Sequence, residues 1–427
     1  MSLFQGIFSN LLENKYVGSP AMLFDFKKKQ TISELLKKII ESRGEASALL
    51  YSEQLMKRLE NFDDKELLEF FIILARDFDI NKDDLTKSVS SYSLDSSIEN
   101  YQIMTSNFQS KRVELFKKLN AVERGTIRLV NIRKRLLVFL NEHRELKKVD
   151  IDLTNLFKNW FNRGFLVTHP ISWNTSAKLL EKIVQYEAVH EISSWLDLRN
   201  RLEPDDRRCY SFFHPTMEEE PLIFVEVALT SKTPSKIDEI LDINREIINP
   251  KDATTAVFYS ISNCQKGLKG ISFGNFLLKQ VVIDLKKELP NLDNFITLSP
   301  VPGFSKWLDR TNPTLFGKII DESSLITCEK EMLENAVEYF FYAKQNDGLP
   351  IDPVQRFHLS NGASLEKIHS LGDLSKRGIS NSAGLMVNYK YEMKNLEKNH
   401  EKYFSEGIIS ASKSLTSQSK TITIKND

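Results

Sequence analysis

The sequence predicts an α+β fold, an all-helical N-terminal bundle followed by a mixed α/β domain. From about residue 21 to 149, apolar residues recur only at helical spacing, whereas β-branched and aromatic runs of strand length appear later. The chain of 427 residues is also longer than one compact core normally reaches. We therefore expect a helical domain over residues 1–148 and a mixed domain over 149–427.

The helical pattern of the first domain is clearest over residues 62–78. Asp63 can cap the first turn, and Glu66, three residues later, completes a capping box. The apolar side chains that recur at helical spacing, and so predict a buried face, are Leu67, Phe70, Phe71 and Leu74.

A later helical stripe of the same domain is accompanied by basic residues. Its apolar positions are filled by Ile127, Val130, Leu137 and Leu140. Its other faces carry Arg128, Arg133, Lys134 and Arg135. A basic amphipathic helix can bind a membrane or nucleic acid. We instead expect a solvated face on a bundle helix, because acidic residues are close by and the net charge is zero.

After residue 149 the pattern changes to strands that alternate with helices. Residues 222–229 and 255–262 are runs of strand composition and length. A glycine-bearing loop then leads into an expected helix over 273–289, and residues 295–298 form the next expected strand. This strand, turn, helix and strand make one α/β unit.

The rest of the chain continues the mixed pattern. Residues 309–350 have a mostly helical pattern, and residues 385–391 predict a late strand. Beyond about residue 410 the chain is rich in Ser, Thr and Lys, so we expect a frayed tail.

The charge balance and the termini limit the classes of partner. Lys and Arg number 58, as do Asp and Glu, so no bulk field would draw the chain to DNA or an anionic membrane. No run of about 18 uncharged apolar residues predicts a spanning helix. The N-terminus lacks the basic cluster and cleavage site of a signal peptide, and the C-terminus lacks a peroxisomal signal. We expect no nucleic acid partner, no membrane association and a cytoplasmic location.

Three cysteines, Cys209, Cys264 and Cys328, lie far apart and form no CxxC pair. This pattern predicts neither a disulfide framework nor a zinc site, and it is typical of a reducing compartment. We expect each cysteine to be a small buried apolar residue.

The turn at residues 265–274 is a candidate anion site. Small residues there leave backbone N–H groups free at the start of a helix, which suits a pyrophosphate. The candidate binding residues are Lys266, Lys269, Gly270, Ser272 and Gly274. This turn resembles the coenzyme A turn of GNAT acetyltransferases, with Ser272 at the first glycine position. Most glycine-bearing turns bind nothing, so that alternative stays open.

Ser299 follows the strand at 295–298, where two prolines and a glycine force an abrupt exit from the sheet. Ligands gather at the carboxyl ends of strands in such sheets, which makes Ser299 a candidate catalytic residue. The alternative is that Ser299 is an N-cap or ST-turn residue for the short helix that runs through Leu308.

Two histidines compete for a catalytic role. His358 stands in a polar, glycine-rich segment before an expected turn, and His214 stands before Pro215. The residues themselves do not rank the two. In the late strand, alternation would send Tyr389 and Tyr391 to the same sheet face, where ordinary core packing is the alternative to a functional role.

Six separated segments, taken together and in order, resemble the malonyl-CoA decarboxylase family. They are residues 207–215 (RRCYSFFHP), 220–230 (EPLIFVEVALT), 256–262 (AVFYSIS), 298–304 (LSPVPGF), 357–363 (FHLSNGA) and 384–391 (GLMVNYKY). The resemblance runs from about residue 153 to 404.

The resemblance implies a helical domain that mediates homo-oligomerisation and a GNAT-like catalytic domain. It implies that Ser299 and His358 are catalytic and that Tyr391 supports them. It also implies a substrate, malonyl-CoA, a product, acetyl-CoA, and a place in fatty acid metabolism. Relatives carry Glu where this chain has Ser272, so the role of a carboxylate there is not carried over.

The implied chemistry needs neither a metal nor an organic cofactor. Loss of carbon dioxide from a malonyl thioester leaves an enolate, which preorganised donors to the thioester oxygen stabilise. We expect Ser299 and His358 to orient the carboxylate and then to handle the proton. Two other functions stay open, a GNAT-type acyltransferase that passes the acyl group to an amine and a non-catalytic acyl-CoA-binding regulator.

Overall fold

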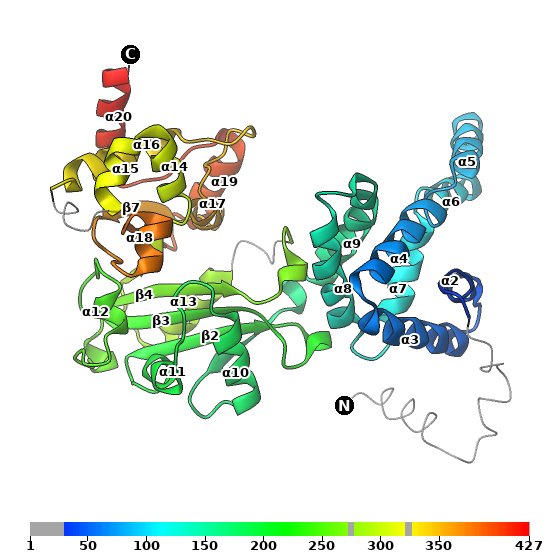
Figure 1. Cartoon of the computed structure of the whole chain (residues 1–427), viewed down its shortest axis with the longest axis horizontal. Coiled ribbons are helices and arrows are strands. Elements are labelled where there is room, and N and C mark those ends of the chain that lie inside the picture. Colours follow the sequence, from blue (N-terminus) through cyan, green and yellow to red (C-terminus); the bar gives the residue numbers. More distant parts are fainter. Residues whose placement is uncertain (1–29, 272–276, 321–326, 427) are drawn as a thin grey trace. The chain divides into compact units, whose positions relative to one another are not determined.

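The computed structural model describes residues 30–271, 277–320 and 327–426 (Figure 1). The chain divides into two compact units, Met1–Leu153 and Thr154–Asp427. The division falls inside helix α9 (Lys147–Trp160), which begins next to Lys148, the residue near which the sequence analysis places a domain boundary.

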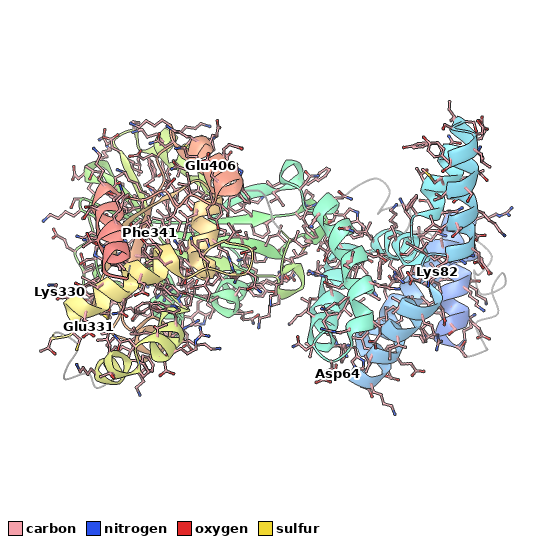
Figure 2. The ribbon with its side chains drawn as sticks, turned by 90° about the horizontal axis from the view of Figure 1, so that it is seen from above. Asp64, Lys82, Lys330, Glu331, Phe341 and Glu406 are labelled. Atoms are coloured by element: carbon pink, nitrogen blue, oxygen red, sulfur yellow. The ribbon has the colours of Figure 1, made fainter. Side chains whose placement is uncertain are left out.

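The described part of the first unit is helical throughout. Its helices are α2 (Ile32–Glu41), α3 (Glu45–Asn61), α4 (Asp64–Asp77), α5 (Lys82–Leu94), α6 (Ile98–Asn107), α7 (Lys111–Asn120) and α8 (Gly125–Phe139). Figure 2 marks the starts of α4 and α5 at Asp64 and Lys82. The predicted capping box of α4 is confirmed, since Asp63 Oδ1 accepts from Glu66 N (2.8 Å) and Glu66 Oε2 accepts from Asp63 N (3.1 Å). The predicted apolar face of α4 is buried.

The prediction of a solvated basic face on α8 is wrong for two of its arginines. Arg133 is 3 % exposed and its Nε donates to Asp150 Oδ1 at 2.7 Å. Arg128, whose side chain is 12 % exposed, pairs with Glu53 at 2.7 Å and with Glu60 at 2.6 Å. The carboxylates come from α3 and α9, which the sequence of α8 alone does not show.

The second unit is built on one eight-stranded sheet in the order β1-β2-β3-β4-β5-β8-β6, with β7 paired to β8. The first four strands are β1 (Val167–Ile171), β2 (Arg207–Phe213), β3 (Pro221–Thr230) and β4 (Thr255–Asn263). The others are β5 (Asn294–Thr297), β6 (Ser299–Pro300), β7 (Ser364–His369) and β8 (Met386–Lys390). The pair β4–β5 is parallel and the remaining pairs are antiparallel.

The sheet opens between β4 and β5. Residues 255–258 of β4 pair with 294–297 of β5, and the N–H of Leu298 still donates to the Phe258 carbonyl at 3.0 Å. Beyond Phe258, β4 continues to Asn263 while pairing with β3. The register of that pairing shifts at the same level, because Ser260 and Phe258 face the consecutive residues Glu226 and Val227 of β3, which leaves Tyr259 of β4 as the extra residue of a bulge. One half of β4 therefore has an edge that β5 does not cover.

The second unit also contains helices, which precede, connect and follow the strands of this sheet in the chain. Those up to β5 are α10 (Ala177–Tyr186), α11 (Trp195–Leu202), α12 (Asp238–Leu241) and α13 (Leu277–Glu288). The later ones are α14 (Phe304–Thr311), α15 (Pro313–Ile320), α16 (Glu329–Tyr342), α17 (Pro353–Ser360), α18 (Lys376–Ser382), α19 (Leu396–Glu406) and α20 (Lys413–Asn426). Short 3₁₀ turns of the second unit lie at Arg163–Phe165, Pro215–Met217, Pro250–Asp252 and Lys266–Leu268, and one at Arg144–Leu146 belongs to the first unit.

Apolar side chains join α10 and α11 to the sheet. Leu180 and Ile183 of α10 and Leu198 of α11 cluster with Cys209 of β2 and Phe224 of β3. Figure 1 shows both helices beside the strands β2 and β3. As predicted, all three cysteines are buried and free.

The four strands predicted from the sequence are present as β3, β4, β5 and β8, whereas the sequence does not predict β1, β2, β6 and β7. The prediction of a frayed tail is wrong, because residues 413–426 form α20. Leu415 is 6 % exposed, and the Tyr342 hydroxyl donates to the Ser419 carbonyl at 2.8 Å. Packing against α16 buries part of this segment, although its polar composition does not predict burial.

In the part of the chain that the structure describes, no helix has the length and apolarity needed to cross a membrane.

Candidate active site

Ser299, His358 and Tyr391 lie next to one another. The Oγ of Ser299 is 3.3 Å from Nε2 of His358, and Nδ1 of the same ring is 2.7 Å from the Tyr391 hydroxyl. All three side chains are buried, at 7 %, 2 % and 2 % exposure. The histidine therefore bridges a serine and a tyrosine in a largely dry environment.

Ser299 is held in the sheet by pairing with β8. It belongs to β6 and pairs with Val387 of β8. The next helix, α14, begins after Gly303, so the prediction that Ser299 could be its N-cap is wrong. A Cβ at Gly303 would lie 2.5 Å from the Tyr339 hydroxyl, so the exit from β6 packs too closely for a side chain.

His358 sits in the last turn of α17. Asp352 caps this helix, accepting from Gln355 N at 2.7 Å and from the Tyr339 hydroxyl at 3.2 Å. The His358 ring stacks on Tyr389, with ring centroids 4.4 Å apart and an interplanar angle of 24°. The cap sets the position of the helix and the stacking sets the plane of the ring.

The two tyrosines of the late strand both contact His358. Tyr391 offers its hydroxyl to the ring edge, whereas Tyr389 offers its ring face. Within the described residues, the buried Tyr389 hydroxyl has no hydrogen-bond partner. Of the two tyrosines, therefore, Tyr391 makes the polar contact with the histidine and Tyr389 makes the stacking contact.

Burial determines the charge states of these groups. It lowers the pKa of His358 to about 3 and raises the pKa of Tyr391 well above its usual range. Near neutral pH the imidazole and the phenol are both uncharged. A neutral imidazole has one donor and one acceptor nitrogen, so the His358 ring can pass a proton between its two neighbours.

His214 occupies a different environment. Its Nδ1 is 2.7 Å from Thr216 Oγ1 and its Nε2 is 3.0 Å from the Trp160 carbonyl. The ring packs on Phe161, and burial lowers its pKa. Both ring nitrogens have local partners, so His358 is the histidine that contacts Ser299.

The candidate anion turn follows β4 directly. Lys266 starts a 3₁₀ turn, and Lys266, Lys269 and Gly270 are exposed. Gly270 has φ +79°, a conformation that suits glycine and that leads the chain toward α13. Ser272 and Gly274 lie outside the described residues.

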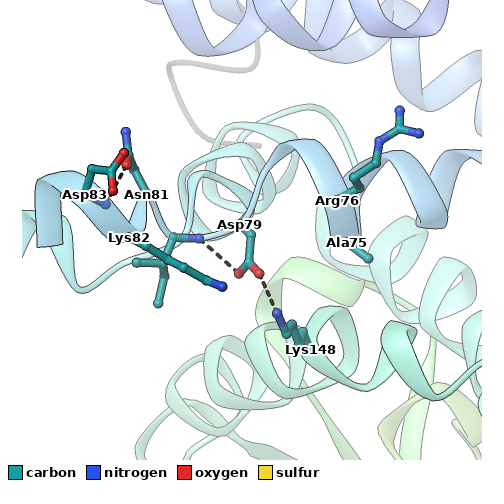
Figure 3. Close-up of a pocket in the computed structure, with 8 residues that line it drawn as sticks. Ala75, Arg76, Asp79, Asn81, Lys82, Asp83 and Lys148 are labelled. Carbon is teal, nitrogen blue, oxygen red and sulfur yellow. Dashed lines mark hydrogen bonds and ion pairs between the residues drawn. The ribbon is translucent and has the colours of Figure 1, made fainter. Parts of the chain in front are cut away.

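A surface hollow of about 590 Å³ in the second unit includes Phe295 and Tyr391 in its lining. Another, of about 580 Å³ in the helical unit, includes Asp79 and Lys148 (Figure 3). Burial raises the pKa of Asp79, but hydrogen bonds from Lys148, the Ile80 N–H and Arg112 outweigh it and lower the pKa to about 2. That carboxylate is occupied by its cationic neighbours, so we place no chemistry there.

Sequence reasoning missed several residues that shape the site. Asp352 had a signal, because an acidic residue directly before a proline is a common helix start. Ser260 and Ser262 also had a sequence signal, since they place two hydroxyls on one face of a mostly apolar strand.

Within residues 30–271, 277–320 and 327–426, no group of three His, Cys, Asp or Glu side chains could hold a metal ion.

Comparisons with known proteins agree with one another. The family model for the malonyl-CoA decarboxylase C-terminal domain matches residues 164–426, and the model for the N-terminal domain matches residues 78–161. Mitochondrial malonyl-CoA decarboxylase of Anser anser anser is 36% identical over 346 residues, covering 71% of this chain and 68% of that protein. The protein of the same name from Rattus norvegicus is 32% identical over 347 residues, covering 71% and 70%.

Two crystal structures are similar over nearly the whole chain. That of malonyl-CoA decarboxylase from Rhodopseudomonas palustris has a TM-score of 0.85 and 45% identity, covering 89% of this chain and 97% of that one. The enzyme from Agrobacterium vitis has a TM-score of 0.85 and 42% identity, covering 90% and 98%.

Proposed function

This chain belongs to the malonyl-CoA decarboxylase family, and we propose that it releases carbon dioxide from malonyl-CoA at the site formed by Ser299, His358 and Tyr391, leaving acetyl-CoA. The observation that carries the assignment of the site is the 3.3 Å contact between Ser299 Oγ and His358 Nε2. This contact brings together two segments that are far apart in the sequence and that each resemble the family.

In the proposed reaction the bond between the carboxylate carbon and the α-carbon breaks. Its electron pair moves into the thioester, giving an enolate, and carbon dioxide leaves. Ser299 and neutral His358 hold the carboxylate with that bond perpendicular to the thioester plane. A proton from solvent then reaches the α-carbon through the same pair. Tyr391 fixes which nitrogen of His358 carries the proton, because its hydroxyl bonds to Nδ1.

The opening between β4 and β5 supports a place for the thioester. In a strand, alternate N–H groups point to opposite edges, so the half of β4 beyond Phe258 offers donors on the edge that β5 leaves. Such donors stabilise an enolate oxygen as charge develops. The exposed turn with Lys266, Lys269 and Gly270 follows that half-strand, and we propose that it receives the pyrophosphate of coenzyme A.

We propose that neither a metal nor an organic cofactor takes part, because the thioester itself accepts the electron pair. Coenzyme A belongs to the substrate.

We also propose that the helical unit mediates homo-oligomerisation. α6 buries none of its side chains, and the hairpin that it forms with α5 carries exposed apolar residues. They are Val89, Leu94, Ile98, Tyr101, Ile103 and Phe108. An apolar surface of this kind is typical of an interface. In Figure 1, α5 and α6 extend beyond the other helices of their unit.

The curated relatives are named as mitochondrial, whereas we propose a cytoplasmic location for this chain. Its three buried free cysteines are typical of any reducing compartment. Fractionation of cells that make the protein tests the proposed location, and recovery with mitochondria would contradict it.

One experiment tests the function. Purified protein is incubated with malonyl-CoA and a chelator, without an amine acceptor, and carbon dioxide and acetyl-CoA are followed. We expect equal amounts of both products. Malonyl transfer to an added amine would indicate an acyltransferase, and tight binding without turnover would indicate a regulator. Activity that the chelator abolishes and a divalent ion restores would contradict the proposal of metal-free chemistry.

A further inference from the structure

A carboxylate from outside the sheet is tied to the uncovered half of β4. Glu187 ends α10, and its two oxygens accept from the Ser260 hydroxyl at 2.9 and 2.7 Å. The Ser262 hydroxyl also donates to Glu187, at 3.2 Å. Ser260 and Ser262 are 1 % and 0 % exposed, and both stand on β4 beyond Phe258.

The same carboxylate orders its own loop. The N–H groups of Val189 and His190 each donate to Glu187 Oε1 at 2.7 Å. The N–H of Ala188 donates to Ser262 Oγ at 3.1 Å, so the loop and the strand are joined in both directions. Residues 187–190 therefore form a brace, by which we mean this loop with its bonds to Ser260 and Ser262.

The brace also reaches the segment that carries Ser299. Arg377 of α18 donates to the Ala188 carbonyl. Farther along α18, Ser382 Oγ accepts from the N–H of Val301, two residues after Ser299, at 3.0 Å. The loop thus connects the free half of β4 with the helix that supports the exit from β6.

We infer that Glu187 is a positioning residue: through Ser260 and Ser262 it holds the half of β4 beyond Phe258 in the place where the thioester binds. This inference rests on the proposed function. A strand that has lost its partner on one edge has only β3 and side-chain contacts to fix it. Donors that stabilise a transition state must be fixed beforehand, because reorganisation during the reaction raises the barrier.

The test compares Glu187→Gln and the double variant Ser260→Ala/Ser262→Ala with a matched control, Ser211→Ala. Ser211 is a fully buried serine on β2, and its hydroxyl donates to the Ile223 carbonyl at 3.2 Å. Removal of the Ser211 hydroxyl breaks a buried hydrogen bond, as the brace variants do, but on a strand that does not border the opening between β4 and β5. Glu187→Gln keeps the side-chain shape and serves if the double variant does not fold.

Three quantities are measured for each variant: the affinity for acetyl-CoA, the affinity for coenzyme A, and kcat with malonyl-CoA. In both brace variants we expect acetyl-CoA to bind about 5- to 10-fold more weakly, the size of one lost hydrogen bond. Coenzyme A affinity should stay within about twofold, since its pyrophosphate is placed elsewhere. The value of kcat should fall roughly 10- to 100-fold, as displacement of a positioned group does.

Ser211→Ala should lower the melting temperature without changing the ratio of the two affinities. If the brace variants leave that ratio unchanged, or if Ser211→Ala changes it equally, Glu187 has only a structural role and the inference is wrong. Wild-type protein that binds acetyl-CoA but does not decarboxylate malonyl-CoA would overturn the proposed function instead. The binding ratio decides the role of the brace in either case.

Discussion

The Oγ of Ser299 lies 3.3 Å from Nε2 of His358, across a separation of 59 residues in the chain. Ser299 begins β6 and His358 lies in the last turn of α17, so their contact depends on the whole packing around β8 and α17. The two residues are placed to act together on one substrate group, so we expect their substitutions to have non-additive effects on kcat.

Ser299→Ala and His358→Asn should each lower kcat by roughly 10²- to 10⁴-fold, the range for positioned acid–base groups. The double variant should lose little more than the worse single variant, because groups that act as a unit are not additive. Steady-state kinetics with malonyl-CoA measures all three. His214→Asn is the control and should affect folding or binding more than kcat, since its ring contacts Trp160 and Thr216. Losses that multiply in the double variant would show that Ser299 and His358 work separately.

Tyr391→Phe should lower kcat by about tenfold, the equivalent of one hydrogen bond. The change removes the hydroxyl that lies 2.7 Å from Nδ1 and leaves a buried ring nitrogen without its partner. Tyr389→Phe is the matched control. It keeps the stacked ring and removes a hydroxyl that has no partner in the described structure, so its effect should be clearly smaller. Equal effects would mean that the polar contact with Tyr391 is not what matters.

Acid should destabilise the folded protein partly through His358. Burial lowers the pKa of His358 to about 3 in the folded state, against a usual value of 6.5. Between these values the unfolded chain binds the proton and the folded chain does not, so stability is present above pH 6.5 and is lost as pH falls toward 3. Urea unfolding at pH 7.5 and at pH 5 should show a larger loss in wild-type protein than in His358→Asn. An equal loss would mean that His358 keeps its usual pKa when folded.

Gly274→Val should raise KM for malonyl-CoA more than it lowers kcat. The prediction follows from the sequence of the turn, in which a bulky side chain would obstruct backbone N–H groups that meet a pyrophosphate. Gly317→Val, at a site on α15 where a Cβ would meet nothing within 4 Å, is the control. An unchanged KM in Gly274→Val would move the nucleotide site to another part of the chain.

Charged residues at the tip of the α5–α6 hairpin should reduce the size of the oligomer. Leu94 is 91 % exposed and Ile98 is 72 % exposed, and Leu94→Asp/Ile98→Asp would place two carboxylates in an apolar interface. Light scattering after gel filtration gives the mass. Val138→Asp, on α8 with 72 % exposure, should leave the mass unchanged. A mass unaffected by the double variant would locate the interface elsewhere.

The site could be predicted from the sequence only through the resemblance to the family. The residues themselves left Ser299 as a possible helix cap and did not rank His358 against His214. The structure decides both points: Gly303, not Ser299, is the N-cap of α14, and both ring nitrogens of His214 already have partners. Both features depend on packing between segments that are far apart in the chain. A local sequence pattern, which spans one or two helical turns, carries no information about such packing.

The fold was more accessible, because periodicity is a local property. Long apolar runs such as β3 and β4 are predicted correctly, whereas β1 and β7 carry exposed or half-buried positions that obscure the alternation of a strand. The tail was missed for a similar reason. Its Ser, Thr and Lys residues favour no core, and α20 is stabilised by packing against α16.

The place of β8 in the sheet has a consequence for synthesis on the ribosome. This strand is the last of the eight to be made, yet it lies between earlier ones, pairing with β5, β6 and β7. Asn388 of β8 donates to the Thr297 carbonyl across 91 residues. Until β8 emerges, a nascent chain exposes the unpaired edge of β5, and unpaired edges invite contact with other chains. The growing chain is therefore prone to aggregate until β8 is made. The same strand leads directly to Tyr391 and so places its hydroxyl beside His358.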